Sequence, residues 1–126
     1  MTLAVLLIAH GSREPSANDD LKVLALRLAE SKTDSIVEFC FLELAEPDIA
    51  AGGSVCVDRG ADRVLMIPYF LSSGIHLRRD LTQARDELSA RFPAVSFQLA
   101  RALGPHPLLD EIVLERVREV ETDWGN

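Results

Sequence analysis

Two histidines and a glutamate stand where three apolar runs of the chain give way to more polar sequence. His10 follows the run LAVLLIA, Glu43 follows IVEFCFL, and His76 comes directly after VLMIPYFLSSGI. If these runs are neighbouring parallel strands, their carboxyl ends meet at one rim of the sheet and the three side chains converge there. Two imidazoles and one carboxylate are suitable ligands for a divalent metal. The spacing therefore predicts a metal site made of His10, Glu43 and His76.

Both histidines also have a simpler structural interpretation. His10 could do no more than end a strand, and His76 could be an ordinary residue at the start of a helix. The second interpretation leaves Arg78 and Arg79 close to the positive end of the helix dipole, which is unfavourable unless an anion compensates them. The serine- and glycine-containing loop before His76 is typical of a binding loop, so function is favoured here.

Glu43 and Glu46 are two carboxylates on the same predicted loop. A carboxylate in a crevice at the end of an apolar strand needs a partner to stay ionised, and a metal or an imidazolium would supply it. Glu46 lies beside Pro47 at an expected helix start, where the helix dipole alone explains an acidic residue. Glu43 is therefore the candidate ligand, and Glu46 is interpreted as structural.

Three further residues that can bind metals have weaker claims. His106 lies in the turn Gly-Pro-His-Pro and is interpreted as a residue that starts a helix. Cys40 and Cys56 have neither zinc-site nor redox-motif spacing. We expect both to be buried thiols that pack like small hydrophobic residues.

The elements that must position these residues alternate between short apolar runs and amphipathic segments. The pattern predicts strands over 3–9, 36–43, 63–71 and 95–100, and helices over 15–31, 47–59, 76–91 and 106–121. Four such units imply an α/β domain with a parallel sheet, and right-handed crossovers favour the strand order 2-1-3-4. The strands over 3–9 and 63–71 are continuously apolar, as expected for strands covered on both faces, whereas the strand over 95–100 alternates like an edge strand.

Three of the predicted helices carry apolar stripes that we expect to pack on the sheet. The stripes are Leu21, Leu24, Ala25 and Leu28; Leu77, Leu81, Ala84 and Leu88; and Leu109, Ile112, Val113 and Val117.

Length, composition and charge limit the possible classes of protein. A chain of 126 residues with 48% hydrophobic content is expected to form one domain over 1–126. Thirteen Lys and Arg against twenty Asp and Glu give a net charge of −7, which disfavours nucleic acid or an anionic membrane as the main partner. No uncharged apolar run approaches the roughly 20 residues of a membrane-spanning helix, and no basic signal region follows Met1. A cytoplasmic protein is expected.

The chain contains no sequence motif for nucleotide or acyl-enzyme chemistry. It lacks the phosphate-binding loop, the dinucleotide-binding turn and the nucleophile elbow. We therefore expect no nucleotide or redox cofactor.

The sequence resembles the CbiX/SirB-type sirohydrochlorin chelatases, the small class II chelatases of cobalamin and sirohaem biosynthesis. The resemblance extends over nearly the whole chain and rests on LLIAHGSR with Asn18, FLELAEPDI, GADRVLMIPYFLSSGIHLRRDL and LGPHPLL, in that order. It implies a flavodoxin-like half with a four-stranded parallel sheet. The length is that of the short, single-half form, which implies a homodimer.

The resemblance also implies an activity: insertion of a divalent metal, as substrate, into a metal-free tetrapyrrole, with His10 and His76 presenting the metal and Glu43 assisting. Cobalt is the first expectation, and iron and nickel remain open because such ligands accept several divalent ions. The many carboxylates of the macrocycle would need local donors, for which the candidates are Ser12, Arg13, Ser72, Ser73, Arg78 and Arg79.

Two other functions remain open from the sequence. The same site could belong to a tetrapyrrole or metal carrier that does not turn over. Alternatively, the chain could be an unrelated flavodoxin-like binding module in which the histidines are incidental.

Overall fold

Strands and helices alternate along the chain, as the sequence predicts. The structure is a computed structural model, and it describes residues 1–123. The elements are β1 (Leu3–Ala9), α1 (Pro15–Ser31), β2 (Ile36–Phe41), α2 (Ile49–Asp58), β3 (Arg63–Pro68), α3 (Ile75–Arg91), β4 (Ser96–Leu99) and α4 (Pro107–Asp123).

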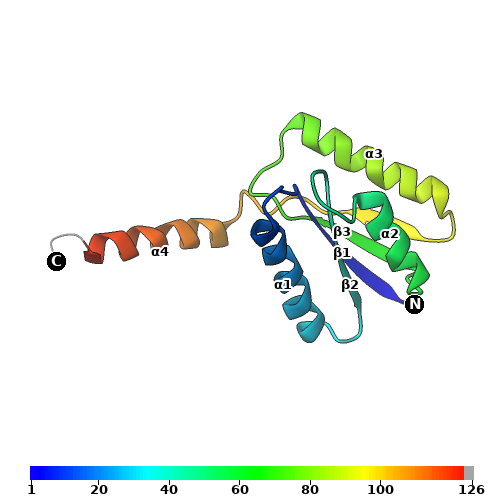
Figure 1. Ribbon diagram of the computed structural model, residues 1–126, viewed down its shortest axis with the longest axis horizontal. Coiled ribbons are helices and arrows are strands. Elements are labelled where there is room, and N and C mark those ends of the chain that lie inside the picture. The colour runs from blue at the N-terminus through cyan, green and yellow to red at the C-terminus, as the bar shows by residue number, and fades with distance from the viewer. Residues whose placement is uncertain (124–126) are drawn as a thin grey trace.

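The four strands form one parallel sheet in the order β2-β1-β3-β4, which confirms the predicted topology. α1 packs on one face over β1 and β2, whereas α2 and α3 pack on the opposite face (Figure 1). The carboxyl ends of β1, β2 and β3 lie together at one rim, and the loops that follow them carry the predicted site residues.

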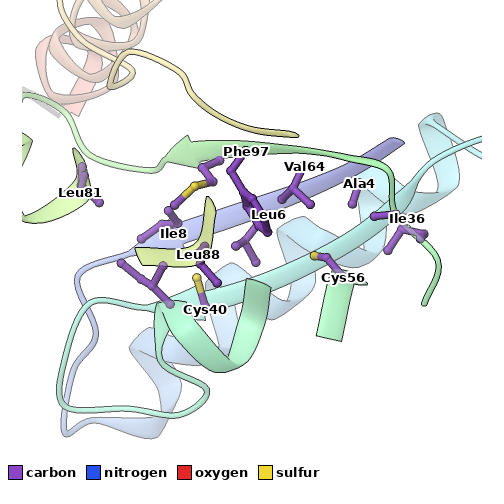
Figure 2. Close-up of a cluster of buried hydrophobic side chains, with 13 residues drawn as sticks. Ala4, Leu6, Ile8, Ile36, Cys40, Cys56, Val64, Leu81, Leu88 and Phe97 are labelled. Atoms are coloured by element: carbon purple, nitrogen blue, oxygen red, sulfur yellow. The ribbon is translucent and has the colours of Figure 1, made fainter. Parts of the chain in front are cut away.

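The main core lies between the sheet and the helices α2 and α3. Leu6, Ile8 and Val64 from the strands and Leu81 and Leu88 of α3 belong to this cluster (Figure 2). A smaller cluster on the other face joins α1 to β1 and β2. Side chains of β1 enter both clusters because successive residues of a strand point to opposite faces.

Two of the predicted strands end two or three residues earlier in the structure, whereas the strand predicted over 95–100 loses one residue at each end. The strand predicted over 36–43 ends at Phe41, because Leu44 adopts a positive φ of 64° and turns the backbone away. The strand predicted over 63–71 ends at Pro68, next to the end of β1. The apolar residues that follow belong to loops, so the pattern of hydrophobic residues alone overestimates both strands.

The expectation that the helix over 106–121 packs on the sheet is wrong. α4 extends away from the rest of the molecule (Figure 1), and every residue from 110 to 122 is exposed. An amphipathic stripe predicts that a helix needs an apolar partner, but it does not specify which surface provides it. As a consequence β3, predicted to be covered on both faces, is fully buried on the face toward α2 and α3 and only half-buried on the other.

No helix in residues 1–123 has both the length and the apolar composition to cross a lipid bilayer.

Candidate functional site

The side chains of His10 and Glu43 meet at the rim of the sheet. Nε2 of His10 lies 2.9 Å from Oε1 of Glu43, and each side chain is a little over half exposed. This is a direct contact between a ring nitrogen and a carboxylate oxygen, both of which are metal-binding atoms. Two groups that can bind metals therefore face each other at the rim, within reach of solvent.

The backbone places these two residues side by side. β1 and β2 pair in register up to Ala9 and Phe41. Two further hydrogen bonds continue the pairing beyond the strands, from Leu42 N to Ala9 O at 2.9 Å and from Glu43 N to His10 O at 3.0 Å.

Gly11 makes the turn after His10 possible. Its φ is +98°, and a Cβ atom at this position would overlap the carbonyl oxygen of Glu43. Only glycine satisfies both conditions without strain, because it has no side chain.

Asn18 fixes the loop that follows Gly11. Its side-chain Oδ1 accepts from Ser12 N at 3.0 Å, and its Nδ2 donates to Ser12 O at 2.7 Å. The Ser12 hydroxyl accepts from the backbone N–H of Glu14, the residue before α1, at 3.0 Å. The loop between β1 and α1 is therefore rigid, and Arg13 is exposed on it.

The His10–Glu43 pair opens onto a cleft of about 540 Å³ between the rim and α3. The helix contributes Asp80 and Glu87, two carboxylates that the sequence analysis did not select. The sequence could have identified these two carboxylates, because residues 76, 80, 84 and 87 have the spacing of one helix face. An acidic cleft beside an imidazole favours a cation.

His76 is the second residue of α3 and is exposed. Within the described part of the chain, no group of three or more His, Cys, Asp and Glu side chains is arranged to hold a metal ion. The structure thus brings His10 and Glu43 together but does not join His76 to them. Phe70, in the segment between β3 and α3, packs edge-on against the His10 ring, with 6.4 Å between the ring centroids.

A second cleft, of about 400 Å³, lies on the other side of the first turns of α3. It brings together Ser72, Ser73 and Arg78 with Arg101, a residue that the sequence analysis missed. Arg101 follows β4, the one strand whose carboxyl end carried no candidate. Arg79 and Arg78 also line a shallow groove along the outer side of α3.

The structure agrees with the interpretation of His106 and of the two cysteines, but it moves the start of α2 away from Glu46. Asp48, not Glu46, caps α2 by accepting from Ala51 N at 2.8 Å, so the predicted helix start at 47 lies two residues too early. His106 precedes α4, and its Nδ1 accepts from Leu108 N at 3.0 Å. Cys40 and Cys56 are buried thiols, as expected.

Burial raises the pKa of both thiols. For Cys40 the shift is large, and the neighbouring Cys56 and Asp48 add to it. For Cys56 burial raises the pKa to about 12, with Glu38 adding to the shift and Arg59 opposing it. Neutral buried thiols of this kind are poor metal ligands and poor nucleophiles.

Comparisons with known proteins agree with this architecture. The CbiX family model matches residues 4–120. The chain is 34% identical over 114 residues to the chloroplastic sirohydrochlorin ferrochelatase of Arabidopsis thaliana, covering 90% of this chain and 51% of that protein. It is 33% identical over 125 residues to the sirohydrochlorin cobaltochelatase of Saccharolobus solfataricus, covering 93% of this chain and 94% of that protein.

The same architecture is found in a solved structure. The sirohydrochlorin chelatase SirB from Bacillus subtilis subspecies spizizenii, in complex with cobalt, superposes with a TM-score of 0.88 at 25% identity, covering 95% of this chain and 51% of that chain. The chain spans about half the length, or less, of the first relatives it matches. Because the family model matches almost the whole length described, the chain belongs to the CbiX family.

Proposed function

We propose that this protein inserts a divalent metal into sirohydrochlorin without the use of ATP, with cobalt or iron as the metal substrate. The observation that carries the proposal is the contact between His10 Nε2 and Glu43 Oε1 at the mouth of an acidic cleft, in a chain of the CbiX family. The names of the relatives support the macrocycle and the metals, since they include a ferrochelatase and a cobaltochelatase.

The spacing of the two ligand atoms suits a metal ion. Two ligands that bind an ion at roughly 2.1 Å and at right angles lie about 3 Å apart, which matches the 2.9 Å between His10 Nε2 and Glu43 Oε1. Metal binding requires a neutral imidazole and an ionised carboxylate, so a metal ion would compete with protons for these two groups. His76 would complete the set by a movement of the start of α3, and the remaining coordination positions stay open for pyrrole nitrogens.

Insertion also requires two pyrrole protons to leave the macrocycle. The carboxylate of Glu43 and the imidazole of His10 are half exposed and can accept protons and pass them to water. The site thus combines metal delivery with acid-base chemistry, and no electron transfer is involved.

The two sides of α3 carry opposite charges, one suited to the metal cation and the other to the carboxylates of the macrocycle. Asp80 and Glu87 face the cleft with His10 and would attract the metal cation. Arg78 and Arg101 line the other cleft with Ser72 and Ser73, and guanidinium groups bind the carboxylates of the macrocycle in a bidentate manner. An overall acidic protein can bind an acidic macrocycle in this way because the cations are local.

The proposed working form is a homodimer. The solved SirB chain is about twice as long as the matched segment, whereas the Saccharolobus relative has about the length of this chain. Two copies of this chain would supply the same amount of structure as one long relative.

The test compares two glutamates on one loop. In Glu43→Gln, cobalt insertion into sirohydrochlorin, followed by the absorbance of the macrocycle, should fall about 100-fold or more. Glu46→Gln, three residues away and exposed, should keep full activity. His10→Ala should lose both activity and cobalt binding measured by calorimetry.

Two outcomes would contradict the proposal. Undiminished insertion by His10→Ala would remove the proposed role of the pair. Tight binding of the macrocycle with no turnover beyond one per protein would identify a carrier instead.

A further inference from the structure

The cleft between the first turns of α3 and the loops after β3 and β4 is positively charged. We call it the arginine cleft; its polar side chains are Ser72, Ser73, Arg78, Thr82 and Arg101. No Asp or Glu of the described chain lines it, although the sequence has twenty acidic residues against thirteen basic ones. Within residues 1–123, neither arginine forms an ion pair with a carboxylate. Two guanidinium groups in one cleft repel each other, so the cleft is suited to an anion that contacts both.

The two loops that form the arginine cleft are fixed to each other. Leu103 N, in the loop after β4, donates to Phe70 O, in the loop after β3, at 3.0 Å. Gly104 packs so closely on the carbonyl of Leu71 that a Cβ atom there would overlap it. The cleft is therefore formed before a ligand binds, and a preformed site loses less conformational entropy on binding.

The cleft on the other side of α3 has the opposite composition. Its charged side chains include Glu43, Asp80 and Glu87, and no Lys or Arg of the described residues lines it. An anionic group is repelled there and attracted in the arginine cleft. The net charge of −7 gives the protein no general attraction for a polyanion. The acid side chains of a macrocycle should therefore bind in the arginine cleft.

The size of the arginine cleft fits side chains of a macrocycle and not the whole ring. Its volume of about 400 Å³ is near the lower end of the roughly 300–1,000 Å³ typical of ligand pockets. A guanidinium group binds one carboxylate through two parallel hydrogen bonds, so Arg78 and Arg101 provide for two carboxylates. Two carboxylates this close repel each other unless each has its own cation. The cleft therefore suits two acid side chains on neighbouring positions of one ring.

We propose that the arginine cleft binds the acetate and the propionate side chains of one pyrrole ring, and that it selects macrocycles in which both are present. Sirohydrochlorin carries an acetate and a propionate on each of its rings. Arg78 and Arg101 are then specificity-determining residues, and the hydroxyl groups of Ser72, Ser73 and Thr82 donate further hydrogen bonds to the same carboxylates. This inference rests on the macrocycle of the proposed function, but not on the metal chemistry.

The test measures the binding of metal-free porphyrins, in the absence of cobalt and iron, by the quenching of porphyrin fluorescence. The probes are uroporphyrin, with an acetate and a propionate on each ring, and coproporphyrin, in which a methyl group replaces each acetate. The wild type should bind uroporphyrin about 10-fold more tightly or better. The net charge of the protein acts in the opposite direction, because it repels the more highly charged probe more strongly. Such a preference therefore requires a local site.

Two single variants and a matched control locate the preference. Arg78→Gln and Arg101→Gln should each lose most of it and bind coproporphyrin nearly as the wild type does, because a single propionate can use the remaining guanidinium. Arg85→Gln should keep the preference, since Arg85 pairs with Asp86 at 2.9 Å and does not line the arginine cleft. Equal binding of the two probes by the wild type would overturn the proposal. So would a preference that survives in the double variant Arg78→Gln, Arg101→Gln.

Assays of metal insertion separate this inference from the proposed activity. A wild type that prefers uroporphyrin but never inserts cobalt into sirohydrochlorin would support the specificity site and reject the activity. Cobalt insertion by the double variant with an unchanged KM for sirohydrochlorin would support the activity and reject the specificity site.

Discussion

His10 and Glu43 are joined twice, by their side chains at 2.9 Å and by a backbone hydrogen bond from Glu43 N to His10 O at 3.0 Å. The second contact extends the register of β1 and β2 by one step beyond the strands. The position of the two functional groups therefore depends on the strand pairing of the core and on the two loops at its end. Substitutions in those loops should affect the site first.

Gly11→Ala should destabilise the protein far more than Gly60→Ala. Both glycines have a φ near +100°, so both substitutions carry the backbone strain of about 1–2 kcal/mol. Only at Gly11 would the new Cβ also overlap backbone, at the carbonyl of Glu43; at Gly60 no atom lies within 4 Å. Urea unfolding should show a loss of several kcal/mol for the first variant and about 1 kcal/mol for the second. Equal losses would mean that the approach of the Glu43 carbonyl is unimportant.

Asn18→Ala should lower both stability and metal affinity. The amide is the clamp that holds Ser12 by two hydrogen bonds, and their loss costs about 1–3 kcal/mol. Ser16→Ala, on the exposed side of the same helix turn, is the control. Cobalt titration should show weaker binding only for Asn18→Ala. Unchanged affinity together with lowered stability would mean that the loop does not position His10.

The fold follows from the sequence to a large extent because its signals are local. Apolar runs and amphipathic segments specify the strands and helices, and right-handed crossovers specify the order of the sheet. The proximity of His10 and Glu43 is likewise predictable, since His10 directly follows β1 and Glu43 comes two residues after the end of the neighbouring β2. The packing of α4 cannot be predicted in this way. Its apolar stripe indicates that the helix packs on an apolar surface, but it does not indicate which surface.

The remaining parts of the site depend on side-chain placement that no pattern specifies. Asp80 and Glu87 line the cleft through the placement of α3 on the sheet, which the sequence does not specify. Arg101 and Arg78 line the same cleft although they are distant in the sequence, and no local pattern connects them. His76 is a metal-binding residue type and lies at the same rim as His10 and Glu43. Its distance from those two residues depends on the conformation of the loop between β3 and α3.

Arg101→Gln should impair binding of the macrocycle without impairing binding of the metal. Arg101 lines the cleft with Arg78, Ser72 and Ser73, whereas the proposed metal ligands face the other side of α3. The KM for sirohydrochlorin should rise about 10-fold, the cost of one charge-assisted hydrogen bond. Arg85→Gln is the control, because Arg85 pairs with Asp86 at 2.9 Å on another part of α3. An equal KM for both variants would place the macrocycle elsewhere.

The stability of the protein should fall as the pH rises above about 8.5, and Cys56 should account for part of the loss. In the unfolded chain a thiol ionises near pH 8.5, whereas in the folded protein burial raises the pKa of Cys56 to about 12. Between these values the folded state keeps a proton that the unfolded state has lost, so each pH unit should cost about 1.4 kcal/mol for this thiol. Urea unfolding of the wild type and of Cys56→Ala at pH 7, 9, 10 and 11 provides the measurement. The variant should be less stable at pH 7, because it leaves a small cavity, but its stability should fall less steeply with pH. Parallel curves for the two proteins would show that the Cys56 thiol ionises as easily in the folded state as in the unfolded chain.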